Sequence, residues 1–169
     1  LHEAGYATGL VGKWHLGYDG QVVPTKMGFD EFFGHLGGKI DYYKHTDSTQ
    51  KGKHDLWEGQ KEVTREGYST DLFTERARQF IREHATKPFF LQLAYNAPHY
   101  PTDKGVYQAP ESYLNRFAVT GSPDRTRGGY AAMVSCLDDG VGQVLGELRA
   151  LKLEDKTLVI FLSDNGAEV

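Results

Sequence analysis

The sequence is poor in several features that would indicate particular classes of protein. It holds one cysteine, Cys136, so no disulfide can form within the chain and the redox compartment stays open. No apolar stretch approaches the roughly 20 residues that a membrane-spanning helix requires. Lys and Arg number 19 against 23 Asp and Glu, without a long basic run, which excludes non-specific nucleic-acid binding driven by charge. The chain begins at Leu1 with no signal peptide, and we interpret it as an excerpt of a longer protein.

The residues that are present suit a globular α/β domain. Hydrophobic residues make up 39% of the 169-residue chain and aromatic residues 12%, which is enough for a packed core. Short apolar runs predict strands at 6–11, 89–95 and 157–162, and the last of these is typical of a central parallel strand. Apolar residues at spacings of three and four predict helices at 69–81 and 130–151. Strands that alternate with helices favour a parallel sheet with crossover helices.

Three segments lack such periodicity. Residues 17–38 are rich in glycine with scattered aromatics, and we expect a long loop there. Residues 39–67 fit a hairpin or an irregular excursion, in which His45 and His54 are predicted to be solvated because neither has a second ligand at metal-binding spacing. Residues 101–128 are predicted to form a long surface connection.

Polar side chains follow each of the three predicted strands. Lys13 and His15 come after the first, His99 after the second, and Asp164 with Asn165 after the third. Because the carboxyl ends of parallel strands meet at one edge of a sheet, these five residues are expected to lie near one another. A cationic Lys and two imidazoles at that edge suit an anionic substrate.

Each motif taken alone also has a plainer interpretation. A Lys-x-His pair occurs in ordinary strand-to-loop turns, and His99 lies between two prolines that would stiffen any turn. Asp-Asn-Gly at 164–166 is a favoured turn sequence. Carboxylate and amide oxygens do suit Ca²⁺ or Mg²⁺, but two side chains fall short of the roughly six to eight oxygens that calcium takes.

The run GYATGLVGKWHLG at residues 5–17 resembles one of the two signature sequences of the sulfatases, the formylglycine-dependent members of the alkaline-phosphatase-like superfamily. Met-Gly-Phe-Asp at 27–30, Asn-Ala-Pro-His at 96–99 and Ser-Asp-Asn-Gly at 163–166 follow in the order of that family. The resemblance implies an α/β fold, a partial alkaline-phosphatase-like three-layer sandwich with a mostly parallel sheet. Residues 1–169 would form part of a single catalytic domain.

The resemblance also implies a role for each motif residue. Lys13 would contact both the sulfate and the formylglycine nucleophile, His15 would hydrogen-bond the formylglycine hydrate, and His99 would meet the sulfate ester. Asp164 and Asn165 would bind a divalent cation, for which calcium is expected. The substrate would be a small sulfated molecule, an aryl sulfate or a sulfated sugar, and a periplasmic, secreted or lysosomal location is implied by the family alone.

The nucleophile is the point at which the sequence departs from the family. Cys136 stands in Val-Ser-Cys-Leu-Asp, which lacks the Pro and Arg of a Cys-x-Pro-x-Arg motif. The resemblance implies that the nucleophile and an acidic metal-binding pair lie upstream of Leu1 and that a further Lys lies beyond Val169. We therefore expect no activity in the 169 residues alone. Two alternatives stay open: a phosphatase, phosphodiesterase or phosphonate hydrolase of the same superfamily, and a non-catalytic relative that binds sulfated glycans.

Overall fold

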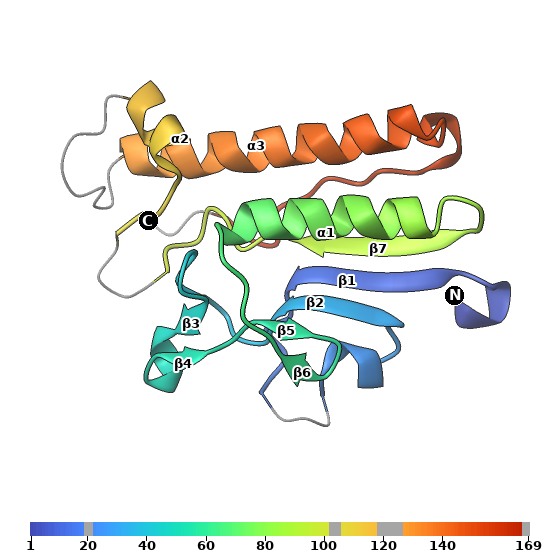
Figure 1. Ribbon diagram of the computed structural model, residues 1–169, viewed down its shortest axis with the longest axis horizontal. Coiled ribbons are helices and arrows are strands. Elements are labelled where there is room, and N and C mark those ends of the chain that lie inside the picture. The colour runs from blue at the N-terminus through green and yellow to red at the C-terminus, as the bar shows by residue number, and fades with distance from the viewer. Residues whose placement is uncertain (19–21, 102–105, 118–126, 167–169) are drawn as a thin grey trace.

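The computed structural model describes residues 1–18, 22–101, 106–117 and 127–166 (Figure 1). Its main feature is a five-stranded sheet in the order β6-β5-β2-β1-β7. These strands are β1 (Ala7–Lys13), β2 (Glu31–His35), β5 (Trp57–Glu58), β6 (Lys61–Glu62) and β7 (Phe89–Ala94). A two-stranded ribbon is made by β3 (Thr46–Asp47) and β4 (Lys53–His54). The α-helices are α1 (Ser69–Glu83), α2 (Glu111–Arg116) and α3 (Arg127–Ala150), and short 3₁₀ turns lie at His2–Ala4, Pro24–Lys26, Ser48–Gln50 and Glu154–Lys156.

β1 is the central strand of the parallel part of the sheet. It pairs in parallel with β2 on one side and with β7 on the other, and its middle five residues are buried. The predicted strands at 6–11 and 89–95 are therefore confirmed as β1 and β7. The carboxyl ends of β1, β2 and β7 share one edge, as expected for parallel strands.

β2 corrects the expectation of a continuous loop over residues 17–38. Phe32 and Phe33 are 3% and 5% exposed, and they place this strand in the core on both faces of the sheet. Asp30 joins the two strands at their start, because its carboxylate accepts hydrogen bonds from the backbone N–H and the hydroxyl of Thr8, at 2.8 and 2.9 Å. The Met-Gly-Phe-Asp motif thus fixes the entry of the chain into β2.

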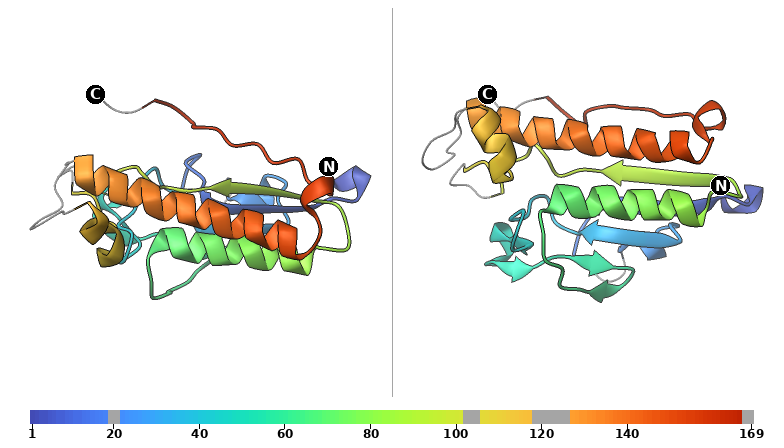
Figure 2. Two further views of the ribbon diagram at one scale, coloured as in Figure 1. Left: turned by 90° about the horizontal axis from the view of Figure 1, so that it is seen from above. Right: turned by 45° about the horizontal axis from the view of Figure 1, so that its top comes forward.

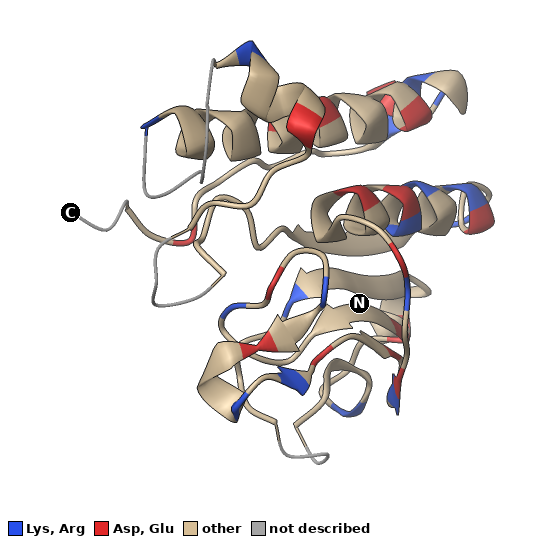
Figure 3. Ribbon diagram, turned by 60° about the vertical axis from the view of Figure 1, so that its left-hand side comes forward, with Lys and Arg blue, Asp and Glu red and all other residues tan. Residues whose placement is uncertain are grey.

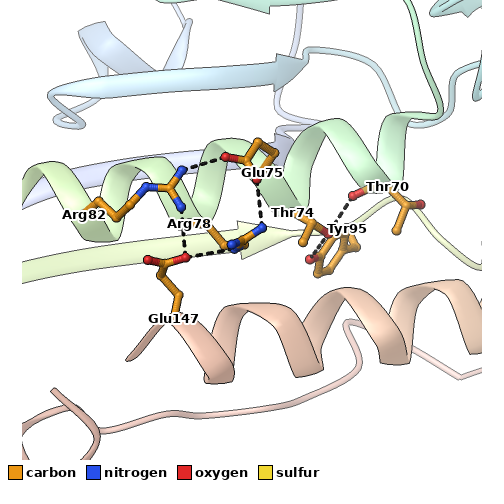
Figure 4. A network of polar contacts seen from close by, with 7 residues as sticks. All are labelled: Thr70, Thr74, Glu75, Arg78, Arg82, Tyr95 and Glu147. Carbon is orange, nitrogen blue, oxygen red and sulfur yellow. Dashed lines mark hydrogen bonds and ion pairs between the residues drawn. The ribbon is translucent and has the colours of Figure 1, made fainter. Parts of the chain in front are cut away.

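The two long helices pack side by side, with α1 against the sheet (Figures 1 and 2). The helices predicted at 69–81 and 130–151 are thus confirmed as α1 and α3. Acidic and basic residues are interspersed along α1 (Figure 3), and Glu147 of α3 accepts hydrogen bonds from Arg78 and Arg82 at 3.0 and 2.9 Å (Figure 4). Gly140 allows α3 to approach α1 closely, because a Cβ there would lie 2.6 Å from the Thr74 hydroxyl.

The helix α2 occupies part of the predicted connection 101–128, of which 102–105 and 118–126 lie outside the described residues.

The excursion at 39–67 is confirmed as two small hairpins, β3–β4 and β5–β6. The prediction of a solvated His45 is wrong. His45 is 1% exposed, and its ring lies edge-on to that of His54 with centroids 6.3 Å apart. His54 in turn donates to the carbonyl oxygen of Val63 at 2.8 Å. Both imidazoles are packing residues of the excursion, which folds back on itself and so buries side chains that a simple loop would expose.

The predicted central strand at 157–162 does not form in the described chain. The segment pairs with no other strand there, and Leu158 and Phe161 are 85% and 79% exposed. Phe161 lines a hollow of about 190 Å³ with three apolar residues of α3, Val134, Leu137 and Val141. A strand requires a neighbour that satisfies its backbone groups, and among the described residues β7 pairs only with β1. The apolar sequence favours burial, but the segment pairs with none of the described strands.

We expect the isolated 169-residue chain to aggregate because of this segment. Five consecutive large apolar residues, Leu158 to Leu162, are 54–85% exposed, and such a β-prone run associates with copies of itself. Size-exclusion chromatography should show oligomers or loss of protein, and replacing Leu158 and Phe161 by Lys should increase the soluble fraction. A soluble monomer with one cooperative thermal transition would contradict the prediction.

Candidate active site

Lys13 is the last residue of β1 and lies half-buried at the carboxyl edge of the sheet. The strand predicted at 6–11 continues to Lys13, which pairs in register with His35 of β2. Burial lowers the pKa of the Lys13 ammonium, and the negative charge of Asp164 opposes that shift. The cation is therefore partly stripped of water at a position where an anion can replace the lost hydration.

His15 is held in an unusual backbone conformation. Its φ is 58°, in the left-handed region that costs a non-glycine residue about 1–3 kcal/mol. Two backbone hydrogen bonds fix it there, from Trp14 N to His35 O at 2.9 Å and from His15 N to Leu36 O at 3.0 Å. The ring rests on Gly38, where any Cβ would meet the imidazole at 2.5 Å. Backbone strain of this kind is concentrated at functional sites, which supports a role for the ring beyond packing.

The electrostatics of His15 indicate which groups surround it. Burial is the main cause that lowers its pKa, and the positive charges of Lys13 and His99 act in the same direction. Asp164 and Asp47 oppose the shift. Lys13, His15, His99 and Asp164 thus lie within electrostatic range of one another, although they come from distant parts of the sequence.

His99 lies in a turn directly after β7. Its backbone N–H donates to the carbonyl oxygen of Asn96 at 2.9 Å, which closes the turn. The ring Nδ1 lies 2.8 Å from the carbonyl oxygen of Tyr100. Because a carbonyl can only accept, Nδ1 carries the hydrogen and Nε2 is the ring atom left for a ligand. The ammonium of Lys39 lies over the ring of Tyr100, 5.3 Å from its centroid, so a further cation adjoins this turn.

Two buried carboxylates support the site and were not found from the sequence. Asp55 is 3% exposed and accepts from the backbone N–H groups of Leu36 and Gly37 at 3.1 and 2.8 Å. Asp47 is fully buried and accepts from the hydroxyl of Tyr18. Asp55 thereby fixes the backbone of the loop on which the His15 ring rests. Both lie in the excursion at 39–67, whose polar and irregular sequence gives no signal of burial.

Asp164 and Asn165 are exposed at the end of the described chain. Their side-chain oxygens are of the hard type that Ca²⁺ or Mg²⁺ prefers, so the donor set fits such a cation, although it supplies only two of the ligands that the ion needs.

A separate group of ligand atoms, from Glu31, Glu83 and His84, lies where β2 begins, at the end of that strand opposite Lys13. Arg76 forms ion pairs with both of these glutamates, so this group is a charge-balanced network rather than part of the site.

The buried imidazole of His35 is expected to make the stability of the folded protein depend on pH. It is fully buried with its ring stacked on Phe73, centroids 6.2 Å apart, and burial lowers its pKa to about 3 from an ordinary value of 6.5. The neutral ring therefore contributes stability that is complete above pH 6.5 and is lost as the pH falls toward 3.

We expect a slope of up to about 1.4 kcal/mol per pH unit in that window from this residue. Urea unfolding of the full-length protein between pH 7 and 4 measures the slope, and His35→Phe, which keeps a ring against Phe73, should reduce it. Equal slopes for the two proteins would show that His35 stays solvated or charged.

The fold is an α/β fold whose parallel strands carry Lys13 and His15 at their carboxyl edge, within electrostatic range of His99 and Asp164. A sulfatase family model matches residues 1–169, and the chain belongs to the sulfatase family. Proteins of this family are hydrolases that act on sulfuric esters, with a metal ion and a formylglycine nucleophile.

Relatives and solved structures support the assignment. Arylsulfatase J of Mus musculus is 41% identical over 175 residues, which cover 99% of this chain and 28% of that protein. N-acetylgalactosamine-6-sulfatase of Homo sapiens is 35% identical over 179 residues, covering 99% of this chain and 31% of that protein. The crystal structure of Ps i-CgsB in complex with k-i-k-neocarrahexaose has a TM-score of 0.75 and 35% identity, and the match covers 90% of this chain and 36% of that one. The chain spans about a third of the length of these proteins.

No described helix is long and apolar enough to cross a membrane.

Proposed function

We propose that the full-length protein containing this chain hydrolyses sulfate monoesters of aryl or carbohydrate alcohols. The observation that carries the proposal is the position of Lys13 and His15 at the carboxyl end of β1, within electrostatic range of His99 and Asp164. Membership of the sulfatase family supports it. We propose a small sulfated molecule as substrate, because the Lys13 ammonium and the imidazoles of His15 and His99 would together suit a single tetrahedral anion.

Each residue has a chemical task in this proposal. A sulfate ester resists hydrolysis because its charged oxygens repel a nucleophile, so the Lys13 ammonium would bind and neutralise those oxygens. His15 would hydrogen-bond the nucleophile. His99 would act as the imidazolium: Nδ1–H would stay bonded to the Tyr100 carbonyl, and Nε2–H would give its proton to the departing alcohol oxygen, which leaves the ring neutral.

The metal and the nucleophile complete the proposed site. Asp164 and Asn165 would hold a divalent cation, for which we propose Ca²⁺, and the bound cation would neutralise charge on the sulfate. We propose a formylglycine outside the 169 residues as the nucleophile. Cys136 does not suit this task, because it is 1% exposed in α3 and burial raises the pKa of its thiol to about 12.

Release of 4-nitrophenol from its sulfate and phosphate esters by the full-length protein tests the proposal. We expect turnover of the sulfate to exceed that of the phosphate, and none by the 169 residues alone, which serve as the control. Preference for the phosphate would assign the protein to phosphoryl chemistry. Binding of sulfated oligosaccharides without turnover would make it a non-catalytic relative.

A further inference from the structure

A buried tyrosine outside the sequence motifs contacts the turn that carries His99. Tyr42 is fully buried, and its hydroxyl donates a hydrogen bond of 2.8 Å to the backbone carbonyl oxygen of His99, 57 positions away in the sequence. The carbonyl belongs to the same residue whose N–H closes the turn on Asn96. The two bonds therefore fix the peptide groups on both sides of the His99 side chain.

Tyr42 is itself held at both its backbone and its ring. Its N–H donates to the side-chain oxygen of Gln108 at 2.8 Å, and its carbonyl accepts from the N–H of Ser69 at 2.8 Å. The ring stacks on that of Tyr68, with centroids 5.2 Å apart and planes at 19°. The hydroxyl is thus aimed by a rigid frame rather than by one flexible side chain.

Gln108 ties this frame together. Its side-chain nitrogen donates to the carboxylate of Asp41 at 2.8 Å, and its backbone carbonyl accepts from the hydroxyl of Tyr68 at 2.7 Å. Asp41 accepts in addition from the backbone N–H groups of Tyr43 and Lys44. Burial raises the pKa of the Tyr42 hydroxyl well above its ordinary value, so it stays a donor.

We propose that Tyr42 is a positioning residue for the proton donor His99. The inference rests on the proposed function, in which Nε2 of His99 meets the departing oxygen. A proton transfer demands a separation of about 2.6–3.2 Å between heavy atoms, so a small drift of the turn weakens it. Without the hydroxyl, the His99 carbonyl loses a buried partner and the turn is free to shift.

A matched pair of substitutions separates positioning from packing. Tyr42→Phe and Tyr68→Phe each remove one buried hydroxyl that donates to a backbone carbonyl, from neighbouring stacked rings. Tyr42 contacts the His99 turn through that hydroxyl, whereas the hydroxyl of Tyr68 bonds to Gln108. Comparable losses of thermal stability are expected from the two variants, so a difference in catalysis isolates the contact with His99.

The readout is the dependence of kcat/KM on the acidity of the leaving phenol, across a series of substituted phenyl sulfates hydrolysed by the full-length protein. A general acid helps a poor leaving group most, so His99→Ala should steepen the dependence. Tyr42→Phe should steepen it in the same direction, with a loss of about tenfold on the least acidic phenol and little on 4-nitrophenol. Tyr68→Phe keeps the hydroxyl that bonds to His99 and loosens only the frame behind it, so its loss on the least acidic phenol should be clearly smaller, about threefold at most.

Two results distinguish the possible failures. If His99→Ala steepens the dependence and Tyr42→Phe does not differ from Tyr68→Phe, the positioning role is overturned while the proposed function stands. If no phenyl sulfate is hydrolysed, or His99→Ala leaves the dependence unchanged, the proposed role of His99 is wrong and the inference about Tyr42 is overturned with it.

Discussion

Replacing Lys13 by Ala in the full-length protein should lower kcat for an aryl sulfate by about a hundredfold or more, with little change in thermal stability. Lys13 lies half-buried at the end of β1, and burial lowers its pKa, so its charge is poorly solvated without an anion nearby. A cation that neutralises charge in the transition state is worth roughly 3 kcal/mol, which corresponds to that loss of rate. Steady-state turnover and a thermal melt of one preparation measure both quantities.

Two further variants show whether charge or geometry matters at this position. Lys13→Arg keeps the charge but not the compact ammonium, so it should recover only part of the rate. Lys26→Ala removes an exposed Lys in the turn Pro24–Lys26 and should change neither rate nor stability beyond about 0.5 kcal/mol. If Lys13→Ala behaved as Lys26→Ala does, Lys13 would be an ordinary surface residue of a strand-to-loop turn.

The elements predicted correctly from the sequence are those with a clear hydrophobic pattern over several residues or helical turns. The helices α1 and α3 repeat apolar residues at helical spacing, and β1 and β7 are short apolar runs bounded by glycine or proline. From these elements alone, the carboxyl edge of a parallel sheet follows, and with it the placement of Lys13, His15 and His99 within electrostatic range of one another. Parallel strands place their carboxyl ends at one edge, which is enough to predict that these side chains lie near one another.

The strand β2 and the apolar segment at 157–162 were misjudged for opposite reasons. β2 has two buried aromatics in five residues, too few to show a period, and its burial is decided by the pairing with β1. The segment at 157–162 has the composition of a buried strand, but composition gives no partner, and pairing is what makes a strand. Local sequence therefore failed where tertiary contacts decide the outcome.

The supports of the site were beyond sequence reasoning for a similar reason. Tyr42 and Asp55 lie in a polar excursion that reads as solvent-exposed, yet they are 0% and 3% exposed. Their hydrogen bonds join residues 57 and 18–19 positions apart. Only the structure shows that Tyr42 hydrogen-bonds the backbone of the His99 turn and that Asp55 hydrogen-bonds the backbone of the loop under His15. These side chains take the place of water as hydrogen-bond partners of buried backbone groups.

Gly12→Ala should lower the free energy of unfolding of the full-length protein by about 3 kcal/mol or more. Gly12 has a φ of 109°, which a residue with a side chain rarely adopts, and its register partner on β7 is Ala94. A Cβ at Gly12 would overlap the backbone carbonyl of Ala94, so relief requires the two central parallel strands to move apart. Because Lys13 is the next residue, the same movement should carry the ammonium out of place and reduce turnover of an aryl sulfate.

Gly142→Ala is the matched control for this substitution. Gly142 lies inside α3 with open space where its Cβ would stand, so an alanine there should stabilise the protein by about 0.5–1 kcal/mol through helix propensity alone. Urea unfolding of the three proteins, with turnover measured on each preparation, compares a backbone that cannot accept a methyl group with one that can. Equal stability of the two variants would mean that β1 and β7 are not held at the close approach that places Lys13 at the edge of the sheet.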